Sequence, residues 1–189
     1  MNLSTRVFLL VFVLASPGRG LAQATFADGA VRAGSLSFDG KATMGDFVGT
    51  TTTVTGQMSG GADLAAVRGW VEAPVNTLRT GNNRRDRDLN KSMESDKFPA
   101  LRFDLTAVTP GAVHGDTTVV TLMGTFKIHG VSREVTVPGT VVHQPGSIRL
   151  RSDFPMNLTD YQIGGLSKML GMLKMHPDIV VHVDVTFAQ

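Results

Sequence analysis

The stretch VTLMGTFKIHGVSREVTV (Val120–Val137) alternates apolar and polar residues on both sides of a central His129-Gly130 pair. Apolar residues or glycine occupy every second position before the pair, and Val131, Val135 and Val137 continue the pattern after it. Successive side chains of a β-strand point to opposite faces, so this period of two predicts two strands, each with one apolar face. A two-residue link that contains glycine is typical of a tight antiparallel turn. The stretch therefore predicts a β-hairpin.

The same alternation recurs through most of the chain. Six further segments show it, separated by Gly, Pro or Asp clusters: Ser35–Gly40, Val48–Met58, Val67–Val75, Leu101–Ala107, Ile148–Phe154 and Ile179–Phe187. Eight antiparallel strands with short links fit an up-and-down barrel or a sandwich. We favour an all-β, lipocalin-like barrel, because closure hides every strand edge in a chain that has no cysteine and therefore no disulfide. Eight strands also enclose enough space for one small ligand.

Two segments interrupt the alternation. Asn82–Glu94 is polar and opens with asparagine cap candidates, which predicts a short helix between the third and fourth strands of this pattern. Met156–Pro177 is rich in methionine and has an apolar stripe at helical spacing, so it predicts a helical or lid-like segment before the last strand. Because methionine adapts to irregular space, the segment fits a gate at the end of the barrel, and it equally fits a plug of ordinary core.

The composition excludes several classes of site. With no cysteine, the chain has no thiolate metal site and no cysteine nucleophile. The five histidines show no H-x-H or H-x-x-x-H spacing, so we expect no metal site and no cofactor. The motifs G-x-S-x-G and H-E-x-x-H, a phosphate-binding P-loop and a dinucleotide-binding glycine fingerprint are also absent from the sequence.

The N-terminal segment predicts export. Arg6 precedes the apolar run Val7–Ala15, which is followed by Ser16-Pro17-Gly18 and by a Leu21–Ala24 segment of the A-x-A type. This order is typical of a secretory signal peptide, and the run has about half the roughly 20 residues that a membrane-spanning helix needs. We expect cleavage after Ala22 or Ala24, which divides the chain into a signal peptide (1–24) and one domain (25–189) in the periplasm or outside the cell. The formal net charge of +2 then disappears with Arg6 and Arg19, which removes the compositional case for a nucleic-acid partner.

Three stretches, one of them inside the hairpin described above, resemble the YceI-like family of exported, lipocalin-like barrels that bind polyisoprenoids and related lipids. TGNNRRD (Thr80–Asp86) resembles the T-G-N-x-x-R-D signature of that family, and Lys97-Phe98-Pro99 resembles its K-[YF]-P. GTFKIHGVSREV (Gly124–Val135) resembles its G-x-L-x-I-H-G-V-[TS]-R-x-V hairpin. The order and spacing of the three stretches also fit the family.

The resemblance implies a barrel around a long apolar tunnel. The side chains expected to line it come from the inward strand faces, from the helix and from the methionine-rich segment: Leu36, Phe38, Val71, Leu89, Leu101, Phe103, Leu105, Leu122, Phe126, Ile128, Leu150, Phe154, Tyr161, Ile163, Met169, Leu170 and Val183. Small residues on the inward faces are expected to leave interior volume: Gly40, Gly69, Ala73, Ala107 and Gly124. Arg85 and Asp86 are expected either to meet a lipid head group or to form a structural pair that ties the helix to the barrel.

The expected function is that of an exported lipid-binding or carrier protein and not of an enzyme. Its partner would be a long-chain lipid such as an isoprenoid, a quinone-like compound or a fatty-acid derivative, with at most transient membrane contact; pairing into a homodimer stays open. Two alternatives stay open as well. One is an isomerase or cyclase that acts on a lipid inside the barrel, and the other is a stress-related interaction module without a ligand.

Overall fold

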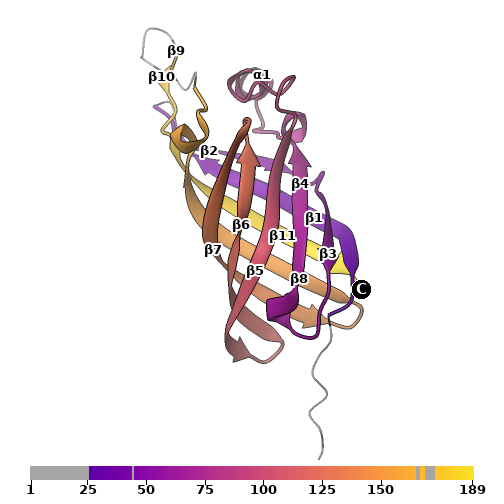
Figure 1. Ribbon diagram of the computed structural model, residues 1–189. Coiled ribbons are helices and arrows are strands. Elements are labelled where there is room, and N and C mark those ends of the chain that lie inside the picture. The colour runs from indigo at the N-terminus through magenta and orange to yellow at the C-terminus, as the bar shows by residue number, and fades with distance from the viewer. Residues whose placement is uncertain (1–25, 44, 165–166, 169–172) are drawn as a thin grey trace, which may run out of the picture.

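The computed structural model describes residues 26–43, 45–164, 167–168 and 173–189, and it shows a closed antiparallel barrel (Figure 1). Nine strands form one sheet in the order β11-β8-β7-β6-β5-β4-β3-β1-β2, and β11 also pairs with β1 to close it. They are β1 (Gly29–Gly40), β2 (Phe47–Thr51), β3 (Thr55–Ser59), β4 (Arg68–Pro74), β5 (Ala100–His114), β6 (Thr117–Ile128), β7 (Val131–Gln144), β8 (Ser147–Asn157) and β11 (Asp178–Ala188). The up-and-down, lipocalin-like barrel predicted from the alternation is confirmed.

The predicted strand Val48–Met58 is wrong in one respect, because the structure divides it into β2 and β3. β2 pairs with the second half of β1, whereas β3 pairs with the start of β1 and with β4. Between them the hydroxyl of the buried Thr51 accepts a hydrogen bond from the Thr53 amide, at 3.0 Å. A threonine side chain that bonds the backbone amide two residues further on competes with the ladder, which explains the break.

The hairpin predicted around His129-Gly130 is confirmed. Ile128 pairs with Val131, and both turn residues have positive φ, 52° at His129 and 76° at Gly130. Positive φ at both central residues is the geometry that matches the twist of the flanking strands. A second two-residue turn, Pro145-Gly146, joins β7 to β8.

The predicted helix is present as α1 (Asn83–Ser92), which in the labels of Figure 1 lies between β4 and β5. The side chain of Asn82 accepts hydrogen bonds from the amides of Arg84 and Arg85, at 2.9 and 3.1 Å, and so caps the first turn. Between β3 and β4 the chain forms only a short 3-10 helix, η1 (Leu64–Ala66), and a second one, η2 (Val75–Thr77), follows β4.

The methionine-rich segment differs from the helical expectation where it is described. It begins with the end of β8 and the 3-10 helix η3 (Leu158–Tyr161). Its other described elements are two short paired strands, β9 (Ser167–Lys168) and β10 (Leu173–Lys174). Met169 and Leu170 lie outside the described residues. β9, β10 and α1 all lie at one end of the barrel (Figure 1).

Candidate functional site

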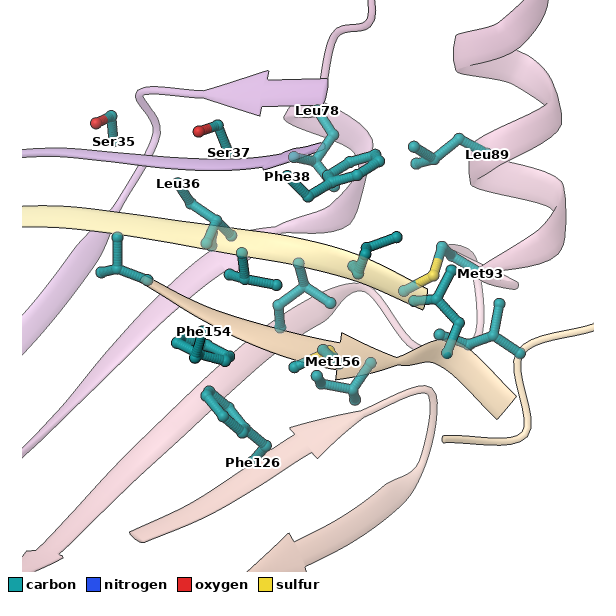
Figure 2. Close-up of a pocket in the computed structure, with 18 of the residues that line it drawn as sticks. Ser35, Leu36, Ser37, Phe38, Leu78, Leu89, Met93, Phe126, Phe154 and Met156 are labelled. Atoms are coloured by element: carbon teal, nitrogen blue, oxygen red, sulfur yellow. The ribbon is translucent and has the colours of Figure 1, made fainter. Parts of the chain in front are cut away.

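The interior of the barrel contains a cavity of about 540 Å³, within the range of sites for small organic ligands. Its wall is built mainly from the inward faces of the strands. Ser35, Leu36 and Ser37 of β1 all contribute to it, and Figure 2 shows Leu36 pointing to the side of Phe154 while the two serines point away from that ring. Leu89 of α1 and Met93, which caps its C-terminal end, point toward the same space, so the helix covers one end of it. Phe126 and Phe154 stack there with ring centroids 5.3 Å apart. The cavity is therefore an apolar chamber with one helical cover.

Most of the side chains predicted from the sequence lie along this wall. They come from six barrel strands, from α1 and from the segment after η3: Leu36, Phe38, Val71, Leu89, Leu101, Phe103, Leu122, Phe126, Ile128, Leu150, Phe154, Ile163 and Val183. The period of two brings them together because the barrel wraps all inward faces around one axis. That they contact a lipid stays a prediction.

Two of the predicted residues lie elsewhere. Leu105 packs against the core but does not reach the cavity wall. Tyr161 is buried in η3, where its backbone carbonyl accepts a hydrogen bond from Nδ1 of His129 at 3.0 Å. Burial also raises the pKa of the Tyr161 hydroxyl, which keeps this group neutral.

The interpretation that small inward residues leave interior volume is wrong for the glycines. A methyl group on Gly69 would come within 2.4 Å of the Gln57 carbonyl oxygen, and one on Gly124 within 2.3 Å of the Asp104 carbonyl oxygen. At Gly40 the space is taken by the ring of Phe47, 2.6 Å away. These glycines allow close packing of strands and rings. Of the five small residues, Ala73 is the one that lines the cavity.

Polar side chains gather where α1 covers the cavity. Asn82, Arg84, Arg85, Asp88 and Ser92 of this region all contribute to the wall. The sequence alone does not distinguish these five residues from the other polar and charged residues of the helix region. Only the position of the helix on the barrel shows which of its faces turns toward the cavity. This end of the cavity can thus accept the polar end of an amphipathic molecule.

Arg85 and Asp86 do not form the pair that the sequence suggested. The Arg85 guanidinium stacks on the Phe47 ring, with its carbon 4.2 Å from the ring centroid. The buried Asp86 carboxylate instead accepts hydrogen bonds from the amide and the hydroxyl of Thr80, at 2.8 and 2.6 Å. The Thr80 hydroxyl is the main cause of the lowered pKa of Asp86, and burial opposes it. Asp86 thus fixes the turn before α1, while Arg85 fastens the helix to β2.

The other two motif stretches meet at the same end of the barrel. The rings of Phe98 and His129 are in edge contact with centroids 4.9 Å apart, and Phe98 also covers Gly130. His129 Nε2 lies 3.5 Å from a carboxylate oxygen of Glu94, which follows α1. These contacts therefore brace the end of the barrel, and none of the four residues, Phe98, His129, Gly130 and Glu94, lines the cavity.

Groups with displaced pKa values lie away from the cavity wall. Hydrogen bonds from Lys127 and Arg102 outweigh burial and lower the pKa of Asp104, and Arg149 lowers the pKa of Asp184. Asp153, and then Asp39, raise the pKa of His182. The cavity itself thus offers apolar burial and a few polar groups at its covered end. Within the described ranges no three His, Asp or Glu side chains gather as a metal site, and no helix there is long and apolar enough to span a membrane.

A closed antiparallel barrel around an apolar chamber defines the class of lipocalin-like binding barrels. Within that class the chain belongs to the YceI-like domain family, whose profile matches residues 30–187. No curated protein sequence matches the chain significantly.

Solved structures share the fold at low sequence identity. The chain is similar to a polyisoprenoid-binding domain from Saccharophagus degradans, with a TM-score of 0.71 and 15% identity over 86% of this chain and 98% of that one. It is also similar to BcnA of Burkholderia cenocepacia, with a TM-score of 0.69 and 15% identity over 81% and 95% of the two chains. A YceI protein of Campylobacter jejuni matches with a TM-score of 0.51 and 15% identity over 65% and 72%.

Proposed function

We propose that this protein is an exported lipid-binding or carrier protein that holds a polyisoprenoid or a similar long-chain lipid inside the barrel. The observation that carries the proposal is the cavity of about 540 Å³, whose wall is mostly aliphatic and aromatic. Membership in the YceI-like family and the polyisoprenoid-binding description of one structural neighbour support it.

An apolar wall is enough to hold such a ligand. Each buried methylene contributes about 0.8 kcal/mol, so a chain of some 20 carbons gains about 16 kcal/mol before the cost of association is subtracted. Leu36, Phe126 and Phe154 supply this kind of contact without any hydrogen bond to the ligand. The proposed partner is therefore defined by its chain more than by its head group.

The polar end of the lipid would lie under α1. Arg84 and Arg85 carry positive charge at this end of the cavity and outnumber the one acidic residue there, Asp88, while Asn82 and Ser92 add neutral polar groups. Guanidinium groups suit carboxylate and phosphate oxygens, so an anionic or strongly polar head group fits here while the chain runs toward Phe126 and Phe154.

The apolar run Val7–Ala15 supports export through a cleaved signal peptide, and delivery would then need only transient membrane contact. Expression of the full chain in a Gram-negative host tests this. The expected result is a periplasmic protein whose mass corresponds to loss of the first 22 or 24 residues; retention of the full mass in the cytoplasm would contradict export.

Extraction of the protein purified from its native host, without added lipid, tests the binding function. Mass spectrometry of the organic extract should detect a long-chain lipid in amounts comparable to the protein, and the stripped protein should bind geranylgeraniol or a dansyl-labelled long-chain fatty acid. An extract free of such lipids, together with no binding in titrations, would reject the proposal.

A cavity-filling variant provides the matched control. Ala73 is 2% exposed and lines the cavity, whereas Met123 lies on the outer face of β6 and is 43% exposed. Ala73→Phe should occupy the chamber and abolish or strongly weaken probe binding, while Met123→Phe adds a similar ring outside and should bind like the wild type. Equal binding by both variants would place the ligand outside the barrel.

A further inference from the structure

The junction between β7 and β8 lacks its hydrogen-bond ladder over half of its length, and we call this unpaired half the seam. β7 and β8 pair from the turn up to Thr140 and Arg151, where the pairing ends. Both strands continue beyond this point, β7 back to Val131 and β8 on to Asn157. In that half β7 pairs with β6 alone and β8 with β11 alone, and the two strands diverge toward the end of the barrel where α1 lies (Figure 1).

Two prolines explain why the ladder stops. In a two-residue hairpin the residues next to the turn exchange hydrogen bonds, and so does every second pair beyond them. From Gln144 and Ser147 this order gives Val142 with Arg149 and Thr140 with Arg151. If the ladder continued, the next two hydrogen-bonded pairs would be Pro138 with Asp153 and Thr136 with Pro155. Each of these two pairs contains a proline, which has no N–H to donate, so each would lose one of its two bonds.

The seam is held by side chains in place of backbone bonds. The hydroxyl of Ser152, which is 5% exposed, donates a hydrogen bond of 2.6 Å to the carbonyl oxygen of Pro138. This bond gives a partner to a carbonyl oxygen that the ladder leaves without one. Nearer to α1, Nε of Arg133 on β7 donates to the backbone carbonyl of Asp160 in η3, at 2.7 Å. Few polar contacts therefore need to break for the strands to separate.

The seam leads directly into the cavity. Val137 of β7 and Ser152, Phe154 and Met156 of β8 stand on its two edges, and all four line the chamber. Val137 and Phe154 are 7% and 4% exposed, so their side chains close the seam in this structure. Separation of the two strands would expose an apolar path along the length of a chain-like ligand.

We propose that the β7–β8 seam is a lateral gate through which a long apolar chain enters and leaves the cavity. The proposal rests on the binding function proposed above. In this proposal Pro138 and Pro155 affect the rate at which the ligand exchanges, because they keep the seam free of backbone hydrogen bonds. The hydrogen bond from Ser152 to the Pro138 carbonyl holds the seam closed, and we call Ser152 the latch.

Stopped-flow exchange of a dansyl-labelled long-chain fatty acid tests the gate. Pro138→Val with Pro155→Val restores both missing donors, and the zipped seam should slow uptake and release by about tenfold or more, with little change in Kd. Pro110→Val, at an exposed position of β5, is the matched control and should exchange at the wild-type rate. Ser152→Ala removes the latch and should speed exchange.

A second route closes the seam without relying on strand pairing. The chain has no cysteine, so Thr136→Cys with Pro155→Cys places two thiols on exposed positions of the two edges. A bifunctional maleimide that bridges them should slow exchange relative to the same variant labelled with a monofunctional maleimide, which shares the Pro155 substitution but has no bridge.

The outcomes separate the gate from the binding function. Wild-type exchange rates in both the proline variant and the bridged variant, with binding intact, would reject the gate and leave the binding function standing. Faster exchange in Arg85→Ala, with unchanged rates in the proline variant, would place the route under α1 and also reject the gate. A wild-type protein that binds neither this probe nor geranylgeraniol would remove the binding function and the gate together.

Discussion

The guanidinium of Arg85 lies over the ring of Phe47, with 4.2 Å between its central carbon and the ring centroid. Phe47 in turn meets Phe38 edge to face, with centroids 6.0 Å apart, and both rings line the cavity. One cation–π contact thus connects the helix that covers the chamber to the wall of the chamber itself. The cover is held by a side chain that a ligand head group can also reach.

The first prediction concerns this contact. Arg85→Ala should loosen α1 and raise the hydrogen–deuterium exchange of the amides in residues 83–92, at a cost of about 0.5–1 kcal/mol in stability. Arg87→Ala removes the same charge from an exposed position of the same helix, so it controls for net charge and helix propensity. Equal exchange in the two variants would show that the stacked pair does not hold the helix.

The second prediction concerns the turn before α1. Asp86→Ala leaves the amide and the hydroxyl of Thr80 without their acceptor, so the free energy of unfolding should fall by about 1–3 kcal/mol. Asp96→Ala, at an exposed position, should change it by less than about 0.5 kcal/mol. Chemical denaturation of both variants measures the difference.

The pH dependence of that loss has a defined sign. Because the folded pKa of Asp86 is lowered, its stabilisation is present above the ordinary aspartate value of about 3.9 and fades as the pH falls through the lower folded value. The stability difference between wild type and Asp86→Ala should therefore be larger at pH 7 than at pH 3. A difference that grows on acidification would contradict the assignment.

The third prediction separates backbone strain from packing at the barrel end. Gly130 and Gly115 have similar positive φ values, 76° and 64°, but a methyl group on Gly130 would meet the Phe98 ring at 2.5 Å, whereas one on Gly115 meets nothing within 4 Å. Gly115→Ala should cost about 1 kcal/mol through strain. Gly130→Ala should cost about 1–3 kcal/mol more, because Phe98 has to move. Equal melting temperatures for the two variants would contradict the packing argument.

The fourth prediction uses the outer face of the barrel. Both ring nitrogens of His182 face carboxylates, Asp153 Oδ1 at 2.6 Å and Asp39 Oδ2 at 3.2 Å, and the hydrogen bond to Asp153 is the main cause of its raised pKa. The stabilisation is complete below the ordinary histidine value of about 6.5 and is lost as the pH rises through the raised folded value. It amounts to a few tenths of a kcal/mol, since the group is partly exposed to solvent.

Thermal unfolding of His182→Gln against wild type checks this sign. The loss of stability should be measurable at pH 5.5 and small at pH 9. His114→Gln, at the exposed end of β5, serves as the control and should show no such trend. A loss that is larger at pH 9 would overturn the assignment.

The sequence by itself determined the class of fold, the hairpin at His129-Gly130, the helix that Asn82 caps and most of the cavity wall. These features follow from local rules, because a period of two assigns each residue to a face and a closed barrel turns all apolar faces inward. The alternation did not reveal that Val48–Met58 is divided into two strands, since the hydrogen bond from the Thr53 amide to the Thr51 hydroxyl leaves the residue pattern unchanged.

Only the tertiary structure decided where the empty space lies and how it is closed. Gly69 and Gly124 look like sources of volume in the sequence, yet neighbouring carbonyl groups fill their places, while Ala73 faces the chamber. Arg85 and Asp86 are adjacent in sequence, but their partners, Phe47 and Thr80, are chosen by the docking of α1. The open ladder beside Pro138 and Pro155 likewise depends on which strand lies opposite. Volume, stacking and pairing are relations between distant segments, so packing fixes them where local periodicity cannot.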